Sequence, residues 1–363
     1  MAKKKWGRSG YSLPAEEMDA LYASLFKQLS KDPEPVVTDG EERTIIEEIS
    51  RHIKHANRSN LTRTASYLLF HSRNPEIHWA LLAHLVSRNG GYSMTDLKSS
   101  YIGPLLGKQE QADLFHLLEW INASIFADAY PQLLLYEESK KRGRNLFHLL
   151  PRFRVSCFME PVWSAFFENG SRSFLTGALI ANEQSMIEKN ILSTSQASHV
   201  MNNLKFTLQE KWGLTRILFP YKTRQKQKRY SVAGLTVMQF QSLHERILTG
   251  KKLYCILYSH QTIHDSILAF CKSSVHTASR SDYWPHLFSP VESPVKLNSP
   301  SLEDSWPLVP APPPAKSDWF KSFGMPKGFE KPETAKVQDL SNKVMADLFK
   351  LAPISAISKK LLH

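Results

Sequence analysis

The residues best suited to binding a ligand lie in a polar run and in the apolar segment after it. The run NRSNLTRT at 57–64 combines two arginines with amides and hydroxyls. Guanidinium groups present forked donors that match phosphate or carboxylate oxygens, and neutral amides and hydroxyls add further hydrogen bonds. This pattern predicts an anion-binding polar cluster of Asn57, Arg58, Asn60, Thr62, Arg63, Thr64, His84, Arg88 and Asn89.

The same run has a structural interpretation that stays open. Asn60 or Thr62 could be the N-cap of a helix that runs to His71. Asn and Thr side chains commonly cap helices and cross-link loops through backbone hydrogen bonds. The alternatives are therefore an anion pocket or a set of local caps.

An enzyme is the alternative to a binding or scaffold protein. Arg58, Arg63 and Arg88 would hold a phosphorylated or anionic substrate, and His78 or His84 would supply acid–base chemistry. A histidine among leucines, such as His78, is more often a core residue with satisfied nitrogens. Because no complete catalytic set is visible, we expect a helical binding or scaffold protein of unknown ligand and cofactor.

Two histidine groups have spacings that a metal site could use. Glu48, His52 and His55 fall on one helical face, and imidazole with carboxylate binds zinc or ferrous iron. His260 and His264 form a second pair, without the glutamate that a metalloprotease needs as its base. Such groups arise often on solvated helix faces, so the prediction is that no metal is bound.

A basic run could bind nucleic acid. The sequence YKTRQKQKRY at 221–230 has five cations between two tyrosines. In proteins that bind single-stranded nucleic acid, cations contact the phosphates and the bases stack on aromatic side chains. A solvated surface loop is the commoner case for such a run. The candidate nucleic-acid residues are Lys222, Arg224, Lys226, Lys228 and Arg229.

Apolar periodicity places these residues in an all-α fold of about ten helices. The central helix is predicted to start at Asn74-Pro75 and to end at Asn89-Gly90-Gly91, since Asn, Pro and Gly favour those positions. Further helices are expected at 109–127 and from Pro131 to Lys141. No alternating pattern of useful length predicts a strand.

Changes of composition divide the chain into four parts. Residues 1–12 read as a basic flexible arm and 13–289 as the helical core. Residues 290–335, rich in proline and serine, predict a flexible linker. Residues 336–352 predict an amphipathic helix with a flexible end to 363, which could fold against a protein partner.

Composition narrows the class of protein. The net charge of +12 makes anionic ligands or nucleic acid plausible partners. Three cysteines without metal spacing fit a reducing compartment. No apolar run reaches the length of a transmembrane helix, and the N-terminus lacks the apolar part of a secretory signal. A cytoplasmic protein is expected.

Several long motifs resemble those of one bacterial family. They are NRSNLTRT at 57–64, PEIHWALLAHLVSRNGG at 75–91, MTDLK at 94–98, LFHLLPRFRVSCFMEPVW at 146–163, ALIANEQSMIE at 178–188 and HTASRSDYWPHLF at 276–288. Together they resemble the YppC-like domain of unknown function, found in uncharacterised proteins of Bacillus-type bacteria. The resemblance covers roughly residues 45 to 290 and implies a bacterial cytosolic context. It brings no known activity, cofactor or catalytic residue.

Overall fold

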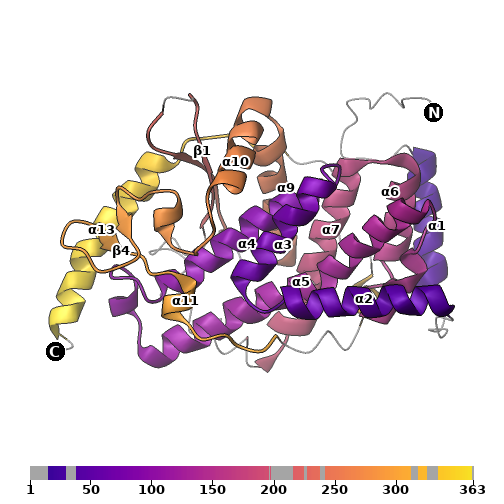
Figure 1. The fold of residues 1–363 in the computed structure, drawn as a ribbon, viewed down its shortest axis with the longest axis horizontal. Coiled ribbons are helices and arrows are strands. Elements are labelled where there is room, and N and C mark those ends of the chain that lie inside the picture. Colours follow the sequence, from indigo (N-terminus) through magenta and orange to yellow (C-terminus); the bar gives the residue numbers. More distant parts are fainter. Residues whose placement is uncertain are drawn as a thin grey trace.

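Long helices that run beside and across one another form most of the protein (Figure 1). The computed structural model describes residues 15–29, 38–195, 197, 216–224, 227–237, 242–311, 318–324 and 334–361. The longer helices are α1 (Ala15–Leu29), α2 (Gly40–Ala56), α3 (Asn60–Arg73), α4 (His78–Asp96), α5 (Lys108–Arg142), α6 (Met159–Asn169), α7 (Arg172–Ile187), α9 (Leu243–Tyr258), α10 (Gln261–Ser273) and α13 (Ser341–Leu361).

Short helical turns connect and cover these elements. They are η1 (Gly103–Leu105), η2 (Phe147–Phe153), η3 (Glu188–Leu192), η4 (Arg280–Asp282), α11 (Leu302–Ser305) and α12 (Trp319–Phe323). The fold is mainly α, which confirms the predicted class. The basic arm at 1–12 lies outside the described residues.

Helix α4 is the centre of the fold, because α3, α5, α7 and α9 all pack against it. Its apolar side chains Trp79, Leu81 and Leu85 are buried. The helix begins at His78, and Asn74 caps the end of α3 instead of the start of α4. The predicted start at Asn74-Pro75 is therefore corrected.

Two glycines lie inside α4, where the sequence predicted its end. A Cβ atom on Gly91 would lie 2.4 Å from the Asn60 side-chain oxygen, and one on Gly90 would lie 2.9 Å from that of Asn122. The glycines thus permit close packing of α4 on α3 and α5, at a cost in helix propensity. The predicted end at Gly90 is wrong because close approach, not a left-handed turn, requires glycine here.

Helix α5 is continuous, although two helices were predicted. It runs from Lys108 to Arg142 with Pro131 inside it. Proline removes one helical hydrogen bond and normally favours a break. Here Phe126, Leu133 and Leu135 around the proline are fully buried, so tertiary packing holds the helix together. The prediction used local propensity, which tertiary packing overrides.

A β-hairpin that the sequence did not predict carries the basic run. Strands β1 (Arg216–Tyr221) and β2 (Ser231–Thr236) pair antiparallel, with Phe219 opposite Ala233. Four consecutive residues at the end of β1 are buried, so neither strand alternates between apolar and polar side chains. That burial explains why the hairpin was missed. A second, very short pair is parallel: β3 (Phe288–Ser289) and β4 (Leu297–Asn298).

The described parts of 290–335 pack against the helices, which differs from the expected flexible linker. The Trp306 ring stacks on Phe115 with centroids 4.2 Å apart, and its indole N–H donates to the Met94 carbonyl. Trp319 is 2% exposed and its indole N–H donates to Asn182 at 2.9 Å. The linker prediction rested on the proline and serine content and did not take account of the two tryptophans, which hold the segment against the helices. Residues 312–317 and 325–333 lie outside the described part.

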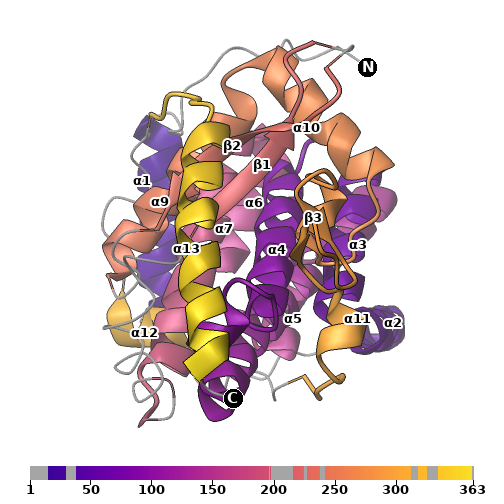
Figure 2. The same ribbon diagram turned by 90° about the vertical axis from the view of Figure 1, so that its left-hand side faces the viewer.

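The C-terminal helix α13 lies against the hairpin of its own chain (Figure 2). The Leu340 N–H donates to the Val232 carbonyl, Val344 is buried, and Asp347 pairs with Arg216. The helix begins at Ser341, later than the predicted 336. Its first turns therefore have a partner within this chain. Among the described residues, no helix is long and apolar enough to cross a membrane.

Candidate anion-binding cleft

Arg63, the centre of the predicted anion cluster, is already neutralised. Its guanidinium NH2 lies 2.5 and 2.6 Å from the two Glu119 carboxylate oxygens, and its NH1 donates to the Asn57 side chain at 3.1 Å. The Arg63 side chain is 1% exposed. Such a charge-assisted pair neutralises a buried cation, although the Arg63 Nε has no hydrogen-bond partner among the described residues. Arg63 therefore joins α3 to α5 and does not face a ligand.

Arg88 is likewise used within the protein. It donates to the backbone carbonyls of Ser274 and Val275 and lies 3.4 Å from a carboxylate oxygen of Asp282. Its Nε also donates to the Tyr92 hydroxyl at 3.2 Å. The residue is 1% exposed. Arg88 thus fastens the segment after α10 onto α4.

Three further members of the predicted cluster, Asn60, Thr64 and His84, form a buried network with Ser87 between α3 and α4. The Asn60 amide donates to the Ser87 carbonyl at 2.8 Å, and Thr64 and Ser87 share a hydroxyl hydrogen bond of 2.7 Å. The His84 Nδ1 lies 2.8 Å from the Thr64 carbonyl oxygen, so Nδ1 carries the proton. Burial, together with Arg88, lowers the pKa of His84 to about 3, so its ring is neutral at pH 7.

Thr62 and Asn89 have backbone partners. Ser59 and Thr62 form the reciprocal capping box of α3, so the capping alternative holds for this helix, but the N-cap is Ser59 and not Asn60 or Thr62 as predicted. The Asn89 amide pairs with Leu218: it donates to the carbonyl at 2.9 Å and accepts from the N–H at 2.8 Å. Asn89 therefore holds β1 onto α4.

His78 does not meet the arginines either. Its Nδ1 lies 2.9 Å from the Tyr254 hydroxyl, and its ring stacks on Tyr258 with centroids 4.0 Å apart. Burial lowers the pKa of His78 to about 3, with smaller contributions from nearby cations. The structure thus does not assemble the alternative catalytic set of Arg58, Arg63 and Arg88 with a histidine.

The other sequence candidates also have local explanations. The His52 ring bonds to the Glu48 backbone carbonyl. His260 is the N-cap residue of α10, and the His264 ring lies 3.3 Å from the Leu257 carbonyl oxygen. No three metal-ligating side chains come together within the part of the chain that the structure describes.

The basic run is the loop of the hairpin. The Lys222 ammonium lies 4.6 Å from the centre of the Tyr230 ring, and Tyr221 is 4% exposed. Neither tyrosine therefore offers an open platform to a base. Arg224, Lys228 and Arg229 are the other described cations here, and Lys226 lies outside the described residues.

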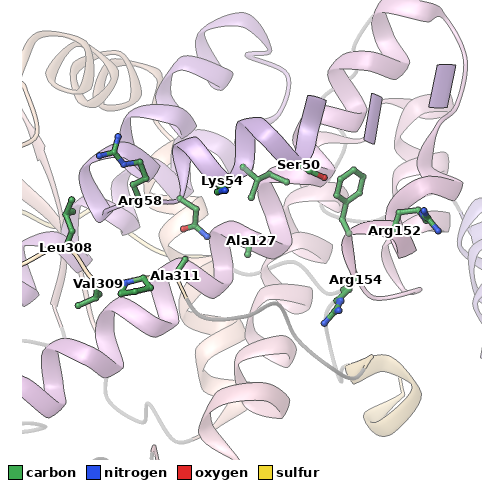
Figure 3. A pocket seen from close by; sticks show the side chains of 13 residues that line it. Ser50, Lys54, Arg58, Ala127, Arg152, Arg154, Leu308, Val309 and Ala311 are labelled. Atoms are coloured by element: carbon green, nitrogen blue, oxygen red, sulfur yellow. The ribbon is translucent and has the colours of Figure 1, made fainter. Parts of the chain in front are cut away.

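Arg58 is the one arginine of the predicted cluster that faces solvent, and it lines a cleft of about 750 Å³ (Figure 3). The walls come from α2, α5, η2 and the extended segment 308–311. Arg58 lies near Leu308 and Val309 at one end of the view, and Arg152 and Arg154 lie at the other. Asn57 also lines the cleft, so two of the predicted residues meet here.

The cleft is positively charged. Among the described residues that line it, the ionisable ones are Lys54, Arg58, Arg152 and Arg154, and none is acidic. Within the described residues, none of these four cations pairs with a carboxylate. Like charges around a low-dielectric wall focus a positive potential and attract anions. This arrangement can bind an anion, whereas the Arg63 and Arg88 pairs cannot.

Arg154 has a backbone conformation that is unusual for arginine. Its φ of 60° and ψ of 24° are left-handed, and it caps the end of η2. Glycine is the ordinary residue at such a cap, because a Cβ atom costs about 1 kcal/mol there. An arginine in this conformation is an outlier of the kind that occurs more often at functional sites. The sequence offered a signal, PRFR at 151–154, which was not recognised as a site.

Two acids, Asp128 on α5 and Glu183 on α7, have strongly raised pKa values. Burial raises the pKa of Asp128 to about 7, against the hydrogen bonds it accepts from Asn182 and Gln132. Burial, with the charge of Asp128, also raises the pKa of Glu183 to about 7. No sequence pattern marked this pair, because α5 and α7 bring the two carboxyl groups together.

Comparisons with known proteins identify the family and no activity. The family described as "Protein of unknown function (DUF2515)" matches residues 55–344. The uncharacterized protein YppC of Bacillus subtilis (strain 168) is 35% identical over 302 residues, which are 83% of this chain and 91% of that protein. No solved structure matches the chain. The chain belongs to the DUF2515 family, which confirms the resemblance to YppC-like proteins.

Proposed function

We propose that this member of the DUF2515 family is a cytoplasmic helical protein that binds an anionic ligand in the cleft between α2 and η2. The observation that carries the proposal is the set of four exposed cations around a cleft with no acid among its described lining residues. A protein that used these residues only for solubility would gain nothing from gathering them around one cavity. The cleft volume of about 750 Å³ lies in the range of small-molecule sites.

Charge reversal at Lys54 and Arg58 tests the proposal. Titration calorimetry measures binding of inorganic tripolyphosphate and of decyl phosphate to the wild type and to the double variant Lys54→Glu/Arg58→Glu. We expect at least one anion to bind and the variant to lose about 10-fold or more in affinity, since tenfold corresponds to about 1.4 kcal/mol.

A matched control pair lies on α2. Arg43 and Arg51 are exposed on α2 and do not line the cleft, so Arg43→Glu/Arg51→Glu changes the net charge equally. Its affinity should stay within about twofold of the wild type at 0.15 M salt, where distant charges are screened. No binding of either anion, or equal losses in both variants, would overturn the proposal.

The left-handed arginine gives an independent test. Arg154→Gly removes one cation of the cleft while it suits the local backbone better. We expect anion affinity to fall several-fold and the midpoint of thermal unfolding to stay equal or rise. A loss of stability with unchanged affinity would mean that Arg154 serves the fold and not a ligand.

A further inference from the structure

The wall between the cations of the cleft is apolar, and it decides which anions fit. Ile53, Phe153 and Val309 line it, together with Ala127, Pro310 and Ala311. Leu308 lines the same wall and is 66% exposed. An exposed leucine beside unpaired cations leaves apolar surface in contact with water, which an apolar part of a ligand would cover.

The cleft offers few neutral polar groups that could recognise a sugar or a base. Only Ser50 and Asn57 among its lining side chains are neutral and polar. The Asn57 amide is already engaged, because it donates to the Ala123 carbonyl at 3.1 Å and its oxygen accepts from Arg63. A site that recognises sugar hydroxyls or nucleobases by hydrogen bonding presents several oriented donors and acceptors. This cleft presents cations and hydrocarbon.

Long basic side chains suit such a mixed surface. Lys54 on α2 and Arg58 in the turn after it have aliphatic stems, which can pack on an apolar ligand while the charged ends stay at the rim. The guanidinium groups of Arg152 and Arg154 add forked donors for phosphate or carboxylate oxygens at the other end of the cleft.

We infer that the ligand of the cleft is an amphiphilic anion: a phosphate or carboxylate head joined to an aliphatic chain. This inference rests on the proposed function and adds the class of ligand. The head would contact the cations, and the chain would cover Leu308 and its apolar neighbours. Such a ligand could be a free amphiphile or the lipid of an anionic membrane surface, which have the same chemistry.

The order of affinities tests the inference. Decyl phosphate, used below its micelle-forming concentration, should bind at least about 10-fold more tightly than tripolyphosphate, although tripolyphosphate carries more charge. If tripolyphosphate binds equally or more tightly and Lys54→Glu/Arg58→Glu weakens it, the proposed function stands and the amphiphile is wrong. If neither anion binds, the proposed function fails as well.

Two exposed apolar residues, Leu308 in the cleft and Val291 outside it, give a test variant and its matched control. Leu308→Ser should lower affinity for decyl phosphate about 5- to 10-fold and leave tripolyphosphate binding unchanged. Val291 is 68% exposed and does not line the cleft, so Val291→Ser should change neither. Both side chains face water, so neither change endangers folding. Equal affinity of Leu308→Ser and wild type for decyl phosphate would overturn the inference.

Vesicles distinguish the two sources of such a ligand. Sedimentation with phosphatidylglycerol vesicles that is lost in Leu308→Ser, and absent with phosphatidylcholine, would identify a membrane lipid. Binding to dissolved decyl phosphate without sedimentation would identify a free amphiphile. Sedimentation that Leu308→Ser and Lys54→Glu/Arg58→Glu leave unchanged, with no binding of dissolved decyl phosphate, would place lipid contact elsewhere and overturn the inference.

Discussion

Arg58 and Arg63 belong to the same short polar run, yet they end in opposite surroundings. Arg63 is buried and pairs with Glu119, which lies on α5. Arg58 is exposed and faces a cleft that lacks acids. The difference does not lie in the run itself. It lies in which distant segment the fold places opposite each side chain.

The comparison teaches where ligand-binding cations should be sought. A buried arginine must be neutralised within the protein, because an unpaired buried charge costs several kcal/mol. Arg63 and Arg88 follow this rule with Glu119 and Asp282. The cations that can contact a ligand are the exposed ones. The fold brings them together, and they need not be close in the sequence.

The largest expected effect comes from breaking the buried pair. Arg63→Ala leaves the Glu119 carboxylate buried without its cation, and we expect a loss of about 3–5 kcal/mol in the free energy of unfolding. Arg58→Ala, on the exposed side of the comparison, should change it by less than about 0.5 kcal/mol. Urea unfolding measures both.

A double replacement distinguishes the cost of leaving Glu119 unpaired from the contribution of the ion pair itself. Arg63→Met with Glu119→Leu removes both charges together, and such apolar replacements are often neutral or stabilising. It should recover most of the stability that Arg63→Ala loses. Equal losses for Arg58→Ala and Arg63→Ala would contradict the contrast between the two arginines.

The sequence predicted well which segments are helices. It did not predict the contacts between residues that are far apart in the sequence. Apolar periodicity found the helices, and composition found a mainly α fold. The role of Arg88 was missed because Asp282 lies far away in the sequence. Arg152 and Arg154 were missed because the cleft exists only once α2, η2 and 308–311, which are far apart in the sequence, surround one space. The aromatic anchors Trp306 and Trp319 were concealed by their proline-rich neighbours.

Asp128 and Glu183 are partly buried acids that pair with no cation among the described residues, and they make stability depend on pH. The pKa of Asp128 is raised from 3.8 to about 7, so folding favours its neutral form. Its contribution is fully present below the unfolded pKa and is lost as pH rises through about 7. We expect wild-type stability to fall between pH 5 and 8, on the order of 2 kcal/mol from Asp128.

An isosteric variant isolates this contribution. Asp128→Asn keeps a side-chain oxygen for Asn182 and Gln132 but cannot ionise. Its urea-unfolding free energy at pH 8 should exceed that of the wild type, and the gap should close toward pH 5. Glu183, whose pKa is also about 7, leaves a residual slope in the variant. Equal slopes in both proteins would mean that Asp128 does not titrate in this range.

The smallest effect is expected at the hairpin loop, the second exposed cluster of cations. Lys222 lies over the Tyr230 ring, and a cation–π contact at an exposed site contributes about 0.5–1 kcal/mol. Changing Lys222, Arg224, Lys226, Lys228 and Arg229 to Gln should therefore cost about 1 kcal/mol at most and leave anion binding in the cleft within about twofold.

The loop variant also tests the nucleic-acid hypothesis. A protein that contacts several phosphates of a single strand shows a slope of about −0.7 per contact in log K against log salt. Because Tyr221 is buried and Tyr230 is covered, we expect weak RNA binding with a slope smaller in magnitude than about 1. Filter binding of an RNA oligonucleotide between 50 and 200 mM salt measures it. A wild-type slope near −3 that the loop variant loses would make the hairpin, and not the cleft, the principal anion-binding surface.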